Sequence, residues 1–483
     1  MAYPHTEDIL GQLPILKSYT HILLCFPQPD PSQTPAILAS LEAAAHQVLA
    51  LFPFLAGQVI NEGSSPTSSG VFKVARHPEW QSPDRQIVRI ADHRTSMPPF
   101  ATLLAAHAPS TMLPGALLSP PRPAFPQPYP DTTIAPVLDI QANLLSGGLI
   151  LALAAQHSII DASGIFQIAS LLARTMRGIP IPAAELLEGN TDRRTLIPLL
   201  PTPDPLLNTT FSELIPPIPP TLPPPAFFAP YAWRYFRFSP TAIKSIHARA
   251  CSPAPPDPHP STKTNNKKTS INDALTAFIW QRLTTIRLTV PSPHHPPLNP
   301  TSESKLTRAL DLRRTLSLTP AYMGHMIRTA NLRLPMSEIA SLPLCDLAAR
   351  LREQIQGLRS MDAVRSYATF LAQQPDKRKI AYGGAFNPRT DFNCSSVAHV
   401  RVEAFGELGR PVLMRRPEFE GGKLPGGCYL APVLGEGEGE GEGDGDGISA
   451  GEKGFECVVC LEGAEMEALR RDGVWGEVAE YVG

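Results

Sequence analysis

A histidine and an aspartate four residues apart form the pattern in this sequence that is best suited to catalysis. His157 and Asp161 stand in the segment 157–164. The unperturbed pKa of histidine is near neutrality, so His157 could accept a proton from a hydroxyl group at physiological pH. Asp161 could support that role, or it could simply cap a helix that begins after it. The spacing alone does not separate a catalytic pair from a packed histidine beside a capping aspartate.

The elements on both sides of segment 157–164 are predicted by hydrophobic patterning. Two apolar runs before it, 136–142 and 149–155, flank a glycine pair, which predicts a β-hairpin. After it, apolar residues recur at helical spacing until a stop signal at Gly178 and Pro180. The segment is therefore predicted to be a short loop between two rigid elements, a common position for catalytic side chains.

Composition excludes several classes of protein. The chain has 483 residues, with 42 basic and 44 acidic side chains, and so lacks the positive charge that drives nucleic-acid binding. No run of about 18 apolar residues predicts a membrane span, and the N-terminus does not resemble a signal peptide. The seven cysteines are odd in number and scattered, as in reduced cytoplasmic proteins. We expect a cytoplasmic protein without nucleic-acid or membrane partners.

Proline divides the chain into two parts. The sequence has 55 prolines, and twelve of them lie between Pro198 and Pro230, where no regular element can accommodate them. We therefore predict an N-terminal half, 1–197, a crossover linker, 198–230, and a C-terminal half, 231–483. Within the second half, residues 435–451 alternate glycine with acidic residues and predict a solvated loop.

A basic segment precedes a predicted helix in the second half. Lys263, Lys267 and Lys268 are followed by Ser270 and Asp273, which are spaced as a capping box. Positive charge and free backbone donors at a helix N-terminus suit a phosphate group. The three lysines and Ser270 are thus candidate cofactor-binding residues, although a solvated basic loop explains the lysines equally well.

A metal site is not predicted. Cys457 and Cys460 have the spacing of a metal-binding pair, but they lie in a predicted strand, where residues three apart face opposite sides. His157 and Asp161 lack a recognisable third ligand.

Several segments in chain order resemble the BAHD-type acyl-CoA-dependent acyltransferases, in particular the fungal trichothecene O-acetyltransferase-like branch. The segments are 10–14, 52–59, 141–161 with the HxxxD motif, 270–281 and 308–325. The resemblance extends from about residue 8 to residue 483. It implies an α/β fold of two similar chloramphenicol-acetyltransferase-like domains, each a mixed β-sheet flanked by helices, with a channel between them.

The resemblance also implies a reaction and a set of roles. An acyl group, expected to be acetyl, would move from acyl-CoA to a hydroxyl of a small secondary metabolite, in a monomer without a permanently bound cofactor. His157 would be the general base, and Asp161 would orient its loop by pairing with Arg313, which we place in a strand 311–313. Ser395 is the candidate donor to the oxyanion that forms during acyl transfer.

Two alternatives to this function stay open. A condensation-type enzyme would share the histidine motif but take its acyl group from a carrier protein. A non-catalytic ligand-binding relative is suggested by the family's DFGWG motif, which is degraded here. Ala404 stands where the aspartate is expected, unless Glu403 replaces it with a shift of one residue.

Overall fold

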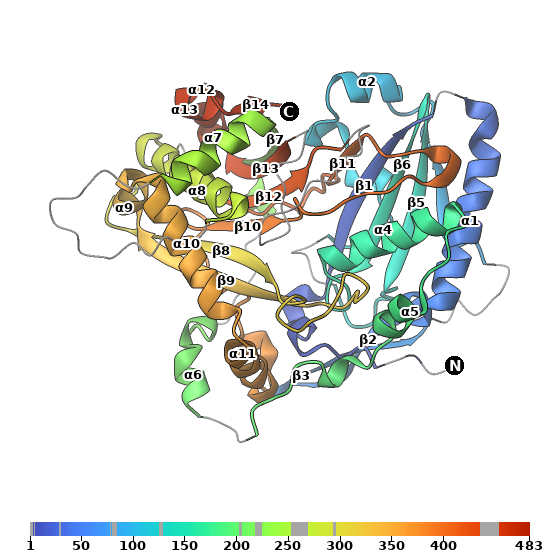
Figure 1. Ribbon diagram of the computed structural model, residues 1–483, viewed down its shortest axis with the longest axis horizontal. Coiled ribbons are helices and arrows are strands. Elements are labelled where there is room, and N and C mark those ends of the chain that lie inside the picture. Colours follow the sequence, from blue (N-terminus) through green and yellow to red (C-terminus); the bar gives the residue numbers. More distant parts are fainter. Residues whose placement is uncertain are drawn as a thin grey trace.

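The computed structural model describes residues 3, 5–28, 30–77, 79, 85–124, 129–201, 205–217, 225–252, 269–292, 296–434 and 454–483. Two mixed β-sheets lie side by side, and helices pack against each of them (Figure 1). The acidic loop predicted over 435–451 and Lys263, Lys267 and Lys268 lie outside the described residues.

The first sheet has five strands in the order β11-β1-β6-β5-β4. Their bounds are β1 Tyr19–Pro27, β4 Val88–Asp92, β5 Leu138–Leu145, β6 Gly148–Gln156 and β11 Leu413–Arg415. The predicted hairpin is confirmed, because β5 and β6 pair antiparallel across the glycine turn. Helices α1 (Thr34–Leu51) and α4 (Ala162–Met176) share one hydrophobic core with this sheet. Smaller elements complete this half: α2 Phe100–Ala105, α3 Gly115–Leu118, α5 Ala183–Gly189, and a separate ribbon of β2 Gly57–Ser65 with β3 Ser68–Arg76.

The second sheet has seven strands in the order β14-β7-β13-β12-β10-β8-β9. Their bounds are β7 Tyr231–Phe238, β8 Glu303–Asp311, β9 Ile327–Pro335, β10 Phe392–Ser396, β12 Gly427–Pro432, β13 Phe455–Glu462 and β14 Ala479–Tyr481. The main helices packed on it are α7 Pro240–Cys251, α8 Ile271–Thr289 and α10 Leu344–Leu358. The remaining helices are α6 Leu206–Thr210, α9 Met336–Ser341, α11 Met361–Gln373, α12 Gly463–Arg471 and α13 Gly473–Gly476.

Two details differ from the predictions. Strand β11 comes from the C-terminal part of the chain but pairs with β1 of the first sheet, so the sheets do not follow the predicted division at 198–230 strictly. The three residues of β11 are too few to carry a periodic signal, and only the pairing identifies them as a strand. In addition, β8 ends at Asp311, so Arg313 lies in the following loop and not in a strand.

Candidate active site

A cavity of about 1060 Å³ lies between the two halves and brings together the predicted reactive groups. His157, Ser163 and Phe166 line it from the N-terminal half. From the C-terminal half, the lining includes Asp311 and Ser395. Most of its wall is apolar, as is usual for a site that binds a small molecule.

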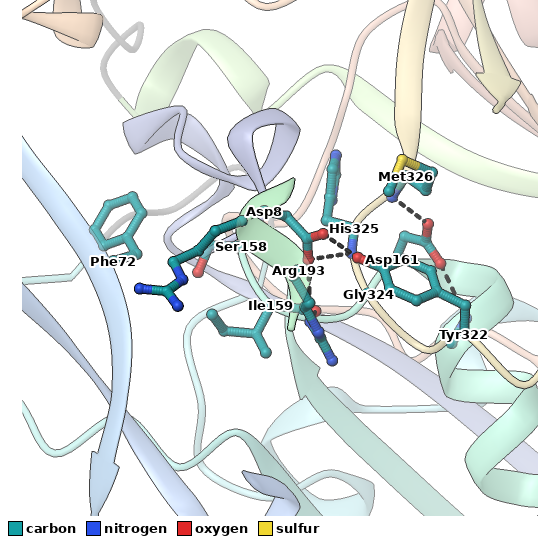
Figure 2. Close-up of polar contacts among 12 residues, drawn as sticks. Asp8, Phe72, Ser158, Ile159, Asp161, Arg193, Tyr322, Gly324, His325 and Met326 are labelled. Atoms are coloured by element: carbon teal, nitrogen blue, oxygen red, sulfur yellow. Dashed lines mark hydrogen bonds and ion pairs between the residues drawn. The ribbon is translucent and has the colours of Figure 1, made fainter. Parts of the chain in front are cut away.

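Asp161 anchors the end of the His157 loop in two ways. Its Oδ1 accepts a hydrogen bond of 2.9 Å from the backbone N–H of Gly164, so it is the N-cap of α4. It also receives two 2.8 Å hydrogen bonds from the guanidinium of Arg313. The backbone N–H of Met326 donates a further hydrogen bond of 2.9 Å (Figure 2). The capping and pairing roles that the sequence left open therefore coexist in one buried carboxylate.

Gly164 allows the loop that carries Arg313 to approach the start of α4. A Cβ atom at this position would lie 2.3 Å from the backbone oxygen of Met323. Because that distance is far below van der Waals contact, the loop could not pack here against any residue with a side chain. The glycine thus brings segment 322–326 of the second half against the HxxxD loop of the first.

A second buried carboxylate, Asp8, anchors the same loop from another side (Figure 2). Its Oδ2 accepts from Arg193 at 3.0 Å and from the backbone N–H of His325 at 3.1 Å, and the hydroxyl of Tyr322 donates to its Oδ1. Arg193 also donates to the backbone oxygen of Ile159 at 2.8 Å. Our sequence analysis missed this cluster, because Asp8 is separated from Arg193 and Tyr322 by more than a hundred residues and no local pattern links them.

His157 is held at its backbone by groups from both halves. Its N–H donates to the backbone oxygen of Ser18 at 2.8 Å, and its carbonyl accepts from Nδ1 of His325 at 2.9 Å. The two imidazole rings lie with their centroids 5.1 Å apart. Burial lowers the pKa of His157, and the nearby charge of Asp161 opposes this effect only in part. The ring is therefore neutral at physiological pH, which is the form that can accept a proton.

Ser395 and Ser270 are placed very differently. Ser395 lies on β10, pairs with Tyr429 of β12 and lines the cavity. Ser270 is buried at the N-terminus of α8 and is not one of the residues that line the cavity. Its hydroxyl forms the predicted capping box with Asp273, donating to that carboxylate at 2.8 Å. A contact between Ser270 and acyl-CoA stays a prediction.

The degraded motif packs against the helix that follows the HxxxD loop. Glu403 forms an ion pair with Arg177 and accepts from the hydroxyl of Ser170 at 2.7 Å. Phe405 is fully buried and meets the ring of Phe26 edge-on, with centroids 5.3 Å apart. This segment thus braces α4 against the first sheet.

The cysteine pair of β13 behaves as predicted for a strand. Cys457 packs in the core under α8, whereas Cys460 faces the opposite cluster around Trp233. Among the described residues, no group of three or more histidine, cysteine or acidic side chains is arranged to hold a metal ion. In the same part of the chain, no helix is both long and apolar enough to span a membrane.

Comparison with known proteins agrees with this architecture. A model of the Transferase family matches residues 125–407, and a model of the trichothecene 3-O-acetyltransferase-like N-terminal domain matches residues 18–175. The chain therefore belongs to the Transferase family, the BAHD family of the sequence resemblance, and it is an O-acyltransferase.

Individual relatives are similar over their whole length. The O-acyltransferase pigD of Monascus ruber is 38% identical over 99% of both chains. The trichothecene 3-O-acetyltransferase TRI101 of Fusarium sporotrichioides is 30% identical over 99% of this chain and 96% of its own. The crystal structure of that F. sporotrichioides TRI101 with coenzyme A and T-2 superposes with a TM-score of 0.83, at 28% identity and full coverage of both chains. Vinorine synthase, at 15% identity and a TM-score of 0.58, shares the fold.

Proposed function

We propose that this enzyme transfers an acetyl group from acetyl-CoA to a hydroxyl of a small secondary metabolite, with His157 as the general base. The observation that carries the proposal is that His157 lines a cavity between both halves, on a loop that Asp161 and Asp8 anchor from two sides. The relatives named O-acetyltransferases and the neighbouring structures with bound coenzyme A support the donor.

The chemistry follows from the state of His157. Its neutral imidazole takes the proton of the acceptor hydroxyl while the oxygen attacks the thioester carbonyl, a contribution of about 10²–10⁴-fold. The tetrahedral intermediate then expels the thiolate of CoA, and the imidazolium returns the proton to that sulfur. Asp161 and Arg313 do not exchange protons in this scheme. They hold the loop so that the ring needs no reorganisation during the reaction.

Ser395 is our proposed donor to the oxyanion. It lies on the wall of the cavity that the second half provides, opposite the loop of the first half, and its hydroxyl can rotate toward a developing charge. Replacement Ser395→Ala is expected to lower kcat by about 10²–10³-fold without a large change in KM. Ser396→Ala is the comparison on the same strand, because Ser396 also lines the cavity, and the two variants together show which serine is the donor.

The decisive experiment combines CoA-thioester binding with the variant His157→Ala. Thermal unfolding with acetyl-, butyryl- and malonyl-CoA identifies the donor, since a ligand at 100 times its Kd adds about 2.7 kcal/mol of stability. His157→Ala should keep this binding and lose at least about 10²-fold in turnover of an acceptor panel. His46→Ala, an exposed histidine on α1, is the control and should behave as wild type.

Two results would contradict the proposal. If His157→Ala retains full turnover, the base lies elsewhere. If no free thioester binds but a pantetheinylated carrier protein does, the chain is a condensation-type enzyme.

A further inference from the structure

Arg416 differs from the other basic side chains that line the cavity. Four of them, Lys17, Lys377, Arg378 and Arg415, donate to a carboxylate or a carbonyl of the chain. Within the described ranges, the guanidinium of Arg416 makes neither an ion pair nor a side-chain hydrogen bond. An arginine that faces an apolar cavity without a partner is unusual, because its charge has lost part of its hydration and gained no anion in return.

The surroundings hold the Arg416 guanidinium in place without using its donors. Its backbone N–H donates to the hydroxyl of Tyr235 at 2.9 Å, directly after β11 ends. The guanidinium carbon lies 3.8 Å from the ring centroid of Tyr429 and 5.7 Å from that of Trp233. Stacking on ring faces fixes the plane of the group and leaves its N–H donors available to a ligand.

Arg416 lies close enough to His157 for its charge to affect the pKa of that imidazole. Both residues line the cavity, and the positive charge of Arg416 adds to the effect of burial in lowering the pKa of His157. The charge of Arg416 also lowers the pKa of His21 on β1. Burial is the main cause and brings that pKa to about 3, although a hydrogen bond with the backbone of Arg122 opposes the shift. His21 is therefore neutral, and Arg416 supplies the positive charge at this end of the cavity.

We propose that Arg416 recognises a carboxylate on the acceptor, and so makes the enzyme selective for an acidic acceptor over a neutral one. This inference rests on the proposed function, because it assigns a specificity residue to the same cavity. The planar fork of a guanidinium matches a carboxylate with two parallel hydrogen bonds. A neutral substrate would leave these donors unused, whereas a carboxylate would satisfy both the charge and the geometry.

The experiment measures binding for two pairs of compounds that differ in one charge. The donor arm compares malonyl-CoA with butyryl-CoA, and the acceptor arm compares 2,4-dihydroxybenzoate with its methyl ester in the presence of CoA. The wild-type protein should prefer the charged acceptor by about 10- to 100-fold and should show no such preference between the two thioesters. Arg416→Gln should abolish that preference and leave the neutral member unchanged, while Arg416→Lys should retain part of it.

Controls separate this role from a loss of folding or of cofactor binding. Arg410→Gln, an exposed arginine six residues earlier, should behave as wild type in both arms. The inference is overturned if the wild-type protein shows no preference for the charged acceptor. It is also overturned if Arg416→Gln weakens CoA itself and both thioesters equally, because Arg416 would then contact the phosphates. If the wild-type protein binds no CoA thioester at all, the proposed function fails as well, so the two failures are distinguishable.

Discussion

Two buried aspartates anchor the His157 loop, and they differ in the hydrogen-bond donors that surround them. Asp161 receives two hydrogen bonds from Arg313 and two from backbone N–H groups. Asp8 has a single hydrogen bond from Arg193 and shares its oxygens with the hydroxyl of Tyr322 and the N–H of His325. Both carboxylates are almost completely buried. Each has one arginine partner, but Arg313 donates two hydrogen bonds to Asp161 whereas Arg193 donates one to Asp8.

Burial changes the pKa of Asp8. Burial raises its pKa to about 6, although the charge of Arg193 and the hydrogen bond from Tyr322 oppose the shift. The Asp8 carboxyl is thus protonated under mildly acidic conditions. The charge of Asp8, unlike its burial, therefore depends on pH in the mildly acidic range.

Removing the cation beside Asp161 should have the largest effect on stability. In Arg313→Met the carboxylate stays buried without its partner, which is expected to lower the free energy of unfolding by about 3–5 kcal/mol. Denaturant unfolding measures this loss. The double variant Arg313→Met/Asp161→Asn removes the unpaired charge and should recover part of it. A single variant within about 1 kcal/mol of wild type would show that Arg313 does not anchor the loop.

Replacing Asp8 should change the pH dependence of stability. Between about pH 4 and pH 6 the folded state holds a proton that the unfolded state has lost, so the contribution of Asp8 falls as pH rises. A shift of about two units corresponds to about 3 kcal/mol. Relative to Asp8→Asn, the wild-type protein should therefore lose up to that amount between pH 4 and pH 7. Parallel unfolding curves for the two proteins would contradict the raised pKa.

The partly exposed ion pair between Glu403 and Arg177 should contribute least to stability. Glu403 and Arg177 are each about one-third exposed, at 34% and 30%. Solvent screens such a pair, so Glu403→Gln should cost no more than about 1 kcal/mol and leave turnover within about twofold. Thermal unfolding and a steady-state assay check both values. A loss of several kcal/mol would mean that the brace on α4 is as important as the buried anchors.

Much of the local structure could be predicted from the sequence. The glycine turn between two apolar runs predicted the β5–β6 hairpin, and helical periodicity after Asp161 predicted α4. The capping box of Ser270 and Asp273 was found from two residue types at the right spacing. These signals are local, because strand alternation, helix periodicity and capping each depend on residues within one or two turns of each other.

The site could be predicted only in part. The pairing of Arg313 with Asp161 followed from the family resemblance, and the structure brings the two side chains together across 152 residues. The strand assigned to Arg313 was wrong, since β8 ends two residues earlier and the loop turns the guanidinium toward the first half. Nothing in the sequence near Asp8 or Arg193 indicates that they meet, and the stacking of Arg416 on Tyr429 is equally invisible there.

The sequence by itself thus determined the candidate histidine, the loop that carries it and the elements on both sides. Tertiary structure decided which distant groups surround that loop, how β11 crosses into the first sheet, and which cation in the cavity is left without a partner. The physical reason is that hydrogen bonds and ion pairs between distant segments depend on where the whole chain places them. Hydrophobic periodicity records only which face of an element is buried, and not what lies against it.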